Sequence, residues 1–380
     1  MFHFLESWRE SFAQDDMTDF VSPKHSKRQV VEAGKLLKGR VSTASDAAIE
    51  AFNIAHNWRA CHLVPMRHLR MELAAKARTI GGEALTAARL KRMISIRAKL
   101  RRTPHTLYQM QDIAGCRAIM PDQASVDRLV ELYERSPRHK FIDQDDYIAS
   151  PRSTGYRSRH LIFRYQGKNE YEPLNSNPQF VEIQLRTKMQ HAWATAVEAV
   201  GMVRGEELKS GHGSHDWLRF FALMASEIAA KEGGVAVPGT PVSEADRRQE
   251  IVGLEHGLNA LGSLENYRNA VKVSEIASTS SPFYLIQFDR LANQVSVRGI
   301  SAKASVKSMD EAETNRQLNS ILVAVDKVSD LRAAYPNYFM DVGLFADTLR
   351  KVVKPKRSLF SIDGSWLTDW AQRRSRGVGE

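Results

Sequence analysis

Apolar residues recur along the first 232 residues with two different periods. A spacing of three and four residues predicts helices at 25–38, Ala47–Arg59, His62–Arg78, Leu85–Arg102, Ser125–Arg135, Lys188–Val203 and Trp217–Glu232. Short apolar or alternating runs predict strands at Asp112–Met120, Arg159–Tyr165 and Phe180–Thr187. We therefore expect a mixed α and β unit over residues 1–232.

A second unit is predicted after a stretch rich in glycine and proline, which favours a linker at residues 233–242. Beyond it the pattern predicts a helix from about 243 to 272, a strand hairpin and a further helix, strand and helix. The bounds are Phe283–Phe288, Val295–Ile300, Ser308–Leu318, Ile321–Val328 and Val342–Val353. Residues 243–380 are thus expected to form a small α+β module without a catalytic constellation of its own.

Charged residues interrupt two of the predicted strands. Asp112 and Arg117 stand in one apolar run, and Glu182, Gln184 and Arg186 alternate with apolar residues in another. A period of two places the alternating polar side chains on one face of a sheet. A solvated face gives the same pattern. Carboxylates and arginines, together with the arginine-rich loop 145–160 between the strands, suit a site for a polyphosphate, a metal ion and a base.

Composition narrows the class of protein and of partner. The 380 residues carry a formal net charge of +10 with a pI near 9.5, which favours an anionic partner or serves general solubility. The two cysteines, Cys61 and Cys116, exclude a disulfide framework and a cysteine-rich zinc site. No apolar run is long enough to span a membrane, and the acidic start does not resemble a signal peptide. We expect a cytoplasmic protein without a membrane segment.

Three short motifs resemble those of the RelA/SpoT synthetase family. They read Asp-Ile-x-Gly-x-Arg at 112–117, Gly-Tyr-x-Ser-x-His at 155–160 and Glu-x-Gln-x-Arg-Thr at 182–187. Their order within 76 residues makes the resemblance specific. It implies a nucleotidyltransferase-like mixed β-sheet flanked by helices. It also implies pyrophosphokinase chemistry, in which the β,γ-diphosphate of ATP passes to a ribose 3′-hydroxyl.

The resemblance assigns roles to individual residues. Asp112 and Glu182 are expected to hold Mg²⁺ and, with Gln184, to be the catalytic residues. A basic segment shared with small synthetases implies an ATP site made by Arg89, Lys91, Ser95, Lys99 and Arg117, in which the arginines enclose adenine. The acceptor is expected to meet an exposed, stacking Tyr156 together with Arg152, Arg157, Ser158, His160 and Arg186.

The C-terminal end resembles the fused toxin–antitoxin branch of the family known as CapRel. There, a Tyr-x-x-Tyr element covers the ATP site, and the matching residues here are Tyr335 and Tyr338. That branch implies an antitoxin module resembling a metal-free zinc finger, tRNA as the acceptor at its 3′-CCA end, and a phage capsid protein as the trigger. The loop arginines favour such a large polyanion. A guanosine tetra- or pentaphosphate synthetase using GTP or GDP, and an inactive RNA-binding module, are the alternatives.

Overall fold

One mixed sheet forms the centre of the molecule. The computed structural model describes residues 21–39, 45–167, 171–175, 177–270, 272–275, 281–289, 291–292, 294–315 and 318–354. Within these residues nine strands join in the order β3-β4-β5-β2-β1-β9-β7-β8-β6. Their bounds are β1 Leu85–Leu90, β2 Ala114–Met120, β3 Lys140–Asp146, β4 Arg159–Arg164, β5 Phe180–Thr187, β6 Lys272–Glu275, β7 Phe283–Asp289, β8 Gln294–Ile300 and β9 Leu318–Val325.

The pairing directions give the sheet its mixed character. Strands β2 and β5 run parallel, as do β6 and β8, whereas the other neighbouring pairs are antiparallel. This confirms the expected α+β fold with a mixed sheet flanked by helices. The helices are α2 Lys27–Lys38, α3 Asp46–Ala60, α4 Leu63–Ile80, α5 Met93–Arg102, α6 Gln123–Arg135, α7 Glu172–Asn175, α8 Lys188–Arg204, α9 His215–Lys231, α10 Glu244–Leu258, α11 Ala260–Ala270, α12 Ser305–Thr314, α13 Asp330–Ala334 and α14 Gly343–Val353.

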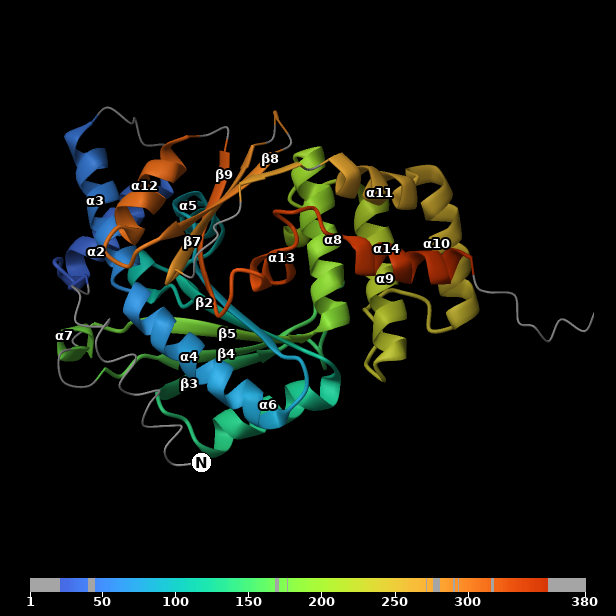
Figure 1. Ribbon diagram of the computed structural model, residues 1–380, viewed down its shortest axis with the longest axis horizontal. Coiled ribbons are helices and arrows are strands. Elements are labelled where there is room, and N and C mark those ends of the chain that lie inside the picture. The colour runs from blue at the N-terminus through green and yellow to red at the C-terminus, as the bar shows by residue number, and fades with distance from the viewer. Residues whose placement is uncertain are drawn as a thin grey trace, which may run out of the picture.

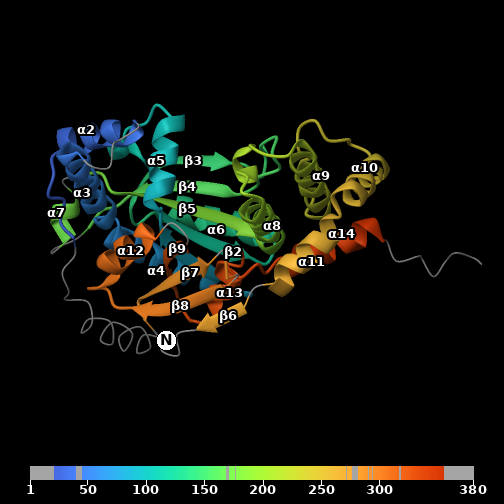
Figure 2. The ribbon, with the colours of Figure 1, turned by 90° about the horizontal axis from the view of Figure 1, so that it is seen from above.

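Apolar side chains project from both faces of the sheet, and each face has its own hydrophobic core. One face packs against α4, α6 and α12, and its core includes Cys116, Leu161 and Ile183. The other face packs against α8 and α13, while α9 and α14 pack in turn on α8, and a cavity lies over the rest of this face. Figures 1 and 2 show α4 and α6 along the sheet and the group α9, α10, α11 and α14 beside it. A third core joins α2, α3 and α5.

The predicted helix Leu85–Arg102 is wrong in its first third. Residues 85–90 form β1, paired on both sides, and α5 starts at Met93 after an extended Arg92. Two neighbouring strands supply backbone hydrogen bonds that a local pattern does not reveal. The predicted helix 243–272 is likewise divided. Asn259 takes a left-handed conformation with φ of 45° between α10 and α11, and Lys272 already belongs to β6.

The C-terminal strands extend the same sheet. In β9, residues 323, 324 and 325 pair antiparallel with Arg89, Ala88 and Ala87 of β1. The segment predicted as a linker packs on α9, because Val237 is buried and its N–H donates to Ser226 Oγ at 2.9 Å. The division into units 1–232 and 243–380 stays a prediction, and a zinc-finger-like module is not confirmed. Residues 1–20 lie outside the described part. In the part that is described, none of the helices combines the length and apolar character needed to cross a bilayer.

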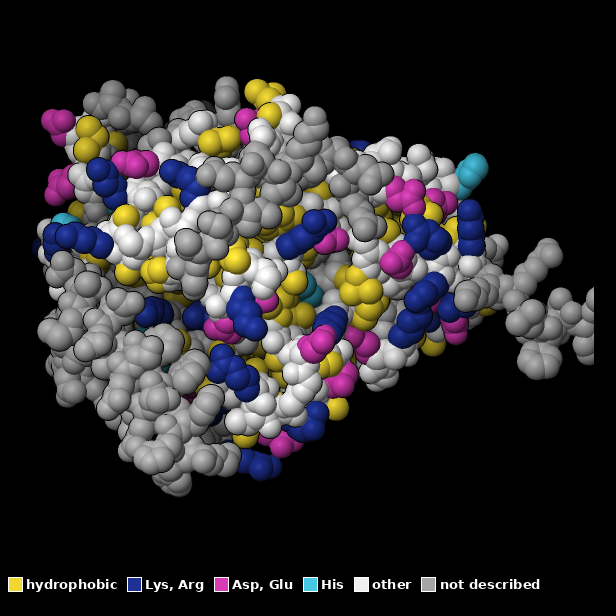
Figure 3. All heavy atoms as spheres, in the orientation of Figure 1, with side chains coloured by type: hydrophobic (Ala, Val, Ile, Leu, Met, Phe, Trp, Pro, Cys, Tyr) yellow, Lys and Arg dark blue, Asp and Glu magenta, His cyan; other side chains and the backbone are white. Residues whose placement is uncertain are grey.

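The surface is basic on average but mixed in detail. On the face drawn in Figure 3, lysine and arginine side chains alternate with aspartate and glutamate over α10 and α14. The net charge of +10 therefore does not produce a uniform basic patch over these helices. The cationic side chains that matter for the site lie on and around the sheet instead.

Candidate functional site

Strand register brings the first group of predicted residues together. Arg89 of β1 stands opposite Gly115 of β2, which in turn stands opposite Glu182 of β5. Two residues along, Arg117 stands opposite Gln184, and Gln184 stands opposite His160 of β4. Side chains at paired positions share a face of a sheet. These residues from four strands therefore project from the face that the helices leave partly uncovered.

A cavity of about 590 Å³ lies over this part of the sheet. Its floor comes from the four strands, and its walls come from the C-terminal half of α5, the loop after β3, the segment 209–212 and Tyr335. The lining residues that carry charge or hydrogen-bonding groups include Arg89, Lys91, Lys99, Arg102, His105, Asp112, Arg117, Asp145, Tyr147, Arg152, Tyr156, His160, Glu182, Gln184, Lys209, His212 and Tyr335. Cations outnumber carboxylates, as a polyphosphate site requires.

Asp112 is held between two ammonium groups. Its Oδ2 lies 2.9 Å from Lys91 Nζ and 2.7 Å from Lys99 Nζ. Burial alone raises the pKa of the Asp112 carboxyl, but the two lysines outweigh burial and lower that pKa from 3.8 to about 2. Asp112 is thus ionised at neutral pH. Lys91 and Lys99 both line the cavity beside Asp112, and their expected contact with ATP phosphates stays a prediction.

A chain of hydrogen bonds links the second carboxylate to an aromatic hydroxyl. His160 Nδ1 lies 2.9 Å from Glu182 Oε1, and the Tyr156 hydroxyl lies 2.9 Å from His160 Nε2. Gln184 Nε2 donates to the other oxygen of Glu182 at 2.5 Å. Burial raises the pKa of Glu182, but the hydrogen bond and charge of His160, together with the hydrogen bond from Gln184, outweigh burial, so the pKa is lowered overall. Both oxygens of this carboxylate are therefore engaged.

The two carboxylates differ in how well they fit a magnesium ion. Asp112 Oδ1 is buried and has no hydrogen-bond partner among the residues that the structure describes, which leaves one hard oxygen open for a cation. Glu182 is already bonded through both oxygens. No cluster of three metal-ligating side chains exists among the described residues. Mg²⁺ commonly takes one or two carboxylates and completes its shell with substrate phosphates and water, so Asp112 fits this mode.

Two arginines and a tyrosine form the opposite side of the cavity. Arg117 Nη1 donates to the carbonyl of Ala334 at 3.2 Å, and its Cζ lies 5.9 Å from the centre of the Tyr335 ring. Burial lowers the pKa of Arg117, and the nearby charge of Arg89 lowers it further. For Tyr335, burial raises the hydroxyl pKa to about 12. Tyr335 therefore occupies space beside the arginines that are expected to enclose adenine.

A second set of charged side chains, Glu198, Lys209 and Arg186, lies at and behind the cavity wall. Lys209 Nζ is 2.5 Å from Glu198 Oε1. Burial raises the pKa of Glu198, but the charges of Lys209 and Arg89 outweigh burial and lower that pKa to about 2. The guanidinium of Arg186 is buried, and its Nε and Nη1 find no hydrogen-bond partner within the described part of the chain. Burial, reinforced by Arg117, lowers the Arg186 pKa to about 9. Arg186 does not line the cavity, so its expected contact with an acceptor is not seen.

The predicted acceptor residues of the loop differ in their surroundings: Tyr156 and Arg152 line the cavity, whereas Arg157 and Ser158 do not. Tyr156, expected to be exposed, is 7% exposed and bonded to His160, because helices α8 and α9 pack against the loop. Arg157 is buried, and its Nη1 and Nη2 donate to the carbonyls of Ile148 and Val235, so it braces the loop. Ser158 is buried and donates to the carbonyl of Leu185. Arg152 lines the cavity, with its guanidinium carbon 4.3 Å from the centre of the Tyr147 ring, and its contact with an acceptor stays a prediction.

Two further predicted residues are placed outside the cavity lining. Ser95 lies on α5 but is not among the lining residues, and Tyr338 is buried behind Tyr335 in the same turn. The sequence reasoning missed Tyr147, Glu198 and Lys209. Tyr147 follows β3 directly, within the predicted loop, and this position was the available signal. The Glu198–Lys209 pair joins α8 to a later turn and has no local signature.

The comparisons agree with the three motifs. Residues 88–201 match a family model described as a region found in RelA/SpoT proteins. The GTP pyrophosphokinase YjbM of Bacillus subtilis (strain 168) is 32% identical over 150 residues, covering 35% of this chain and 68% of that protein. A GTP pyrophosphokinase of Escherichia coli (strain K12) is 27% identical over 169 residues, covering 43% of this chain and 21% of that protein.

Among solved structures, small alarmone synthetase 1 of Bacillus subtilis bound to its product pppGpp resembles the chain. The identity is 23%, the match covers 50% of this chain and 94% of that one, and the TM-score is 0.39. The alignment with YjbM covers 68% of that protein, and the family match contains β2, β4, β5 and the second half of β1. The chain belongs to the RelA/SpoT family and is a diphosphotransferase of the pyrophosphokinase type.

Proposed function

We propose that the chain transfers the β,γ-diphosphate of ATP to the 3′-hydroxyl of a guanosine nucleotide, and that Tyr335 restrains this activity. One observation carries the proposal. An ionised Asp112 between two lysines shares a cavity with Arg89 and Arg117, and Glu182 stands on the same sheet face. Diphosphate transfer needs alignment and charge neutralisation more than covalent help from the protein, and this cavity provides both.

The roles follow from the contacts. The acceptor oxygen bonds to the β-phosphorus of ATP while the bond from that phosphorus to the α,β-bridging oxygen breaks, and AMP leaves with the bridging oxygen. Lys91 and Lys99 neutralise phosphate charge, and Mg²⁺ held by Asp112 would add to that neutralisation when bound. Glu182 accepts the proton of the attacking hydroxyl or orients it, with His160 fixing the carboxylate. Because its pKa is lowered, Glu182 is a weak base and its orienting role is the larger.

The choice of acceptor rests on two different kinds of support. The relatives named above are GTP pyrophosphokinases, which supports GTP or GDP. The resemblance to the fused toxins supports the 3′-CCA end of tRNA, and His105, Lys209 and His212 at the cavity wall suit extra backbone phosphates. The loop arginines give less support to tRNA than their number suggests, because two of the three already have partners within the protein. Arg157 binds loop carbonyls, and Arg159 is paired with Asp146.

Autoinhibition by Tyr335 is the second part of the proposal. The ring is 3% exposed, lines the cavity and lies against Arg117, so an adenine stacked on that arginine competes with it. Tyr338 contributes by packing the turn, whose Tyr338 N–H donates to the carbonyl of Tyr335 at 3.1 Å. A role in phage defence with a capsid protein as trigger is supported by the sequence resemblance alone.

The test is label transfer by the full chain carrying Tyr335→Ala. γ-³²P-ATP is supplied with GTP, GDP or bulk tRNA in parallel, and the blank adds Asp112→Ala. We expect label on the guanosine nucleotides. Label confined to tRNA with an intact CCA end would replace GTP by tRNA as the acceptor. Label on none of them would favour the inactive RNA-binding module. The two carboxylates in the cavity argue against that module, because a site that only binds RNA gains nothing from carboxylates facing phosphate.

A further inference from the structure

Helix α5 begins without a cap of its own. The residue before it, Arg92, makes no capping side-chain bond, and the first turn contains no acidic residue. The first N–H groups of a helix have no partners inside the helix. Here the N–H of Met93 donates to Glu313 Oε2 at 3.2 Å, across 220 positions of sequence. A carboxylate at this end also complements the helix dipole. The C-terminal part of the chain thus supplies the missing cap.

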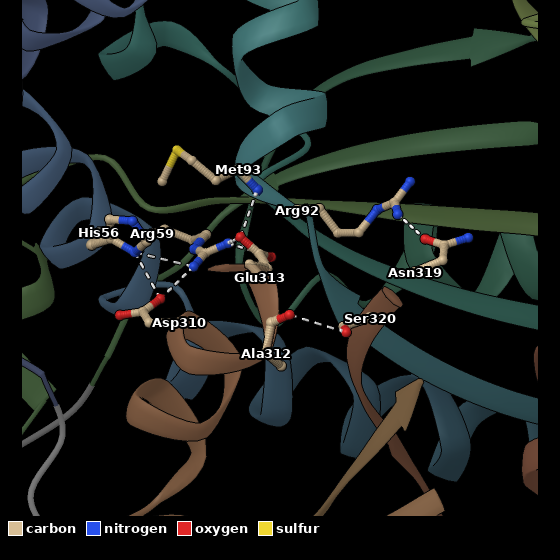
Figure 4. Close-up of polar contacts among 9 residues, drawn as sticks. All are labelled: His56, Arg59, Arg92, Met93, Asp310, Ala312, Glu313, Asn319 and Ser320. Carbon is tan, nitrogen blue, oxygen red and sulfur yellow. Dashed lines mark hydrogen bonds and ion pairs between the residues drawn. The ribbon is translucent and has the colours of Figure 1, made fainter. Parts of the chain in front are cut away.

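The capping carboxylate is itself fixed by a buried arginine. Arg59 of α3 is fully buried, and its Nη1 donates to both oxygens of Glu313 at 2.8 and 2.9 Å. Its Nη2 donates to Asp310 at 2.6 Å, and Asp310 also lies 2.7 Å from His56 Nδ1. Figure 4 shows these side chains converging between α3, α12 and the start of α5. Charge-assisted bonds of this kind are short and directional, so Glu313 has little freedom to move.

The preceding residues of the same segment are held from the C-terminal side as well. Arg92 Nη1 donates to Asn319 Oδ1, and Arg89 pairs with Val323 of β9 in the sheet register. Helix α12 is tied to β9 in turn, because Ser320 Oγ donates to the carbonyl of Ala312 at 3.2 Å. Residues 313–323 therefore contact the stretch from Arg89 to Met93 at three positions, namely Arg89, Arg92 and Met93. This stretch leads into the helix that carries Lys99.

We propose that Glu313 is a positioning residue for the ATP site. By capping α5 it sets the place of Lys99, whose ammonium lies 2.7 Å from Asp112. Glu313 itself does not line the cavity. The proposal rests on the ATP-binding role given to Lys99 under the proposed function. It assigns two opposite tasks to the C-terminal part of the chain: residues 313–323 complete the ATP site, and Tyr335 covers it.

The test compares Glu313→Ala and Glu313→Gln with Glu311→Ala, a matched change on the same helix at a side chain that is 66% exposed. All are made in the full chain carrying Tyr335→Ala. Hydrogen exchange is followed in peptides covering 91–102, with α6 as the internal reference. Binding of a non-hydrolysable ATP analogue and of GTP is measured by calorimetry. Loss of a helix cap typically costs about 1 kcal/mol, which is about a fivefold change in the equilibrium constant for forming that end of the helix. We therefore expect Glu313→Ala to exchange roughly fivefold faster at the start of α5 and to bind the analogue about fivefold more weakly.

The Gln variant separates capping from charge. Its amide oxygen still accepts from Met93 but offers no charge to Arg59, so its effects should fall between those of the parent and Glu313→Ala. Glu311→Ala and GTP binding should be unchanged. Unchanged exchange in α5, or faster exchange without weaker analogue binding, would overturn the proposal. So would a uniform rise in exchange that includes α6, because it indicates general destabilisation. If even the parent fails to bind the analogue, the proposed function fails, while the exchange result still decides whether Glu313 caps α5.

Discussion

Replacing Tyr335 by alanine is expected to tighten the binding of ATP. The ring is 3% exposed and lies 5.9 Å from the Arg117 guanidinium. Truncating a buried aromatic side chain costs about 3–5 kcal/mol, and a desolvated cation–π contact contributes up to about 2 kcal/mol of stabilisation. The Tyr335 ring lies against Arg117 in the covered state and away from it in the open state. If the substitution destabilises the covered state by about 2 kcal/mol more than the open state, the equilibrium shifts roughly 30-fold towards the open state. The apparent dissociation constant of a non-hydrolysable ATP analogue, measured by calorimetry on the full chain, should fall by up to that factor.

Two variants control this measurement. Tyr335→Phe keeps the ring against Arg117 and should bind the analogue as the parent does. Tyr284→Ala removes a tyrosine of β7 that is equally buried but does not line the cavity, so it reports general destabilisation. No gain is expected there. If Tyr335→Ala binds no tighter than the parent, or if Tyr284→Ala gains as much, the covering role of Tyr335 is refuted.

Three further predictions follow from particular contacts. Lys99→Met leaves Asp112 with Lys91 alone, so the kcat/KM for ATP should fall about 100-fold or more; a change under threefold in steady-state assays would exclude a phosphate-binding role. Burial lowers the pKa of His62 from 6.5 to about 4, so between these pH values the unfolded chain binds a proton at His62 and the folded chain does not. The free energy of unfolding should therefore fall by on the order of 3 kcal/mol as the pH is lowered from 6.5 to about 4. Thermal unfolding between pH 8 and 4 should show this loss, and His62→Asn should reduce it. Deleting residues 233–380 uncovers one side of β1 and leaves the buried Arg59 without Asp310 and Glu313. The free energy of unfolding of the fragment 1–232 should therefore be lower than that of the full chain by about 3 kcal/mol or more in denaturant titrations. A fragment as stable as the full chain would contradict this prediction.

The polar face of the sheet could be predicted because it depends on local alternation. Glu182 and Gln184 are two residues apart on a strand, so their common face follows from geometry alone. The family motifs implied separate roles for Asp112 at the metal and for Lys91 and Lys99 at the phosphates, and the ion pairs that join the three side chains were not predicted. Strand β1 was missed, because Leu85–Leu90 has no clear period and becomes a strand through its neighbours β2 and β9.

The loop arginines show where local sequence stops being informative. Arg152, Arg157 and Arg159 are alike in type and close in sequence. Arg152 faces the cavity, Arg157 reaches the carbonyl of Val235, and Arg159 reaches Asp146. Only tertiary packing separates their roles. The bond between Arg59 and Glu313 spans 254 positions, and nothing near either residue indicates it.

The most direct measurement of the central claim is the identity of the products made by the full chain carrying Tyr335→Ala. Its reaction with ATP and GTP would be followed by chromatography and phosphorus NMR. Diphosphate transfer releases AMP in step with a nucleotide that bears a 3′-diphosphate, and Asp112→Asn should abolish both. ADP with a 3′-monophosphate product, or AMP formation that is independent of the acceptor and survives Asp112→Asn, would contradict the account.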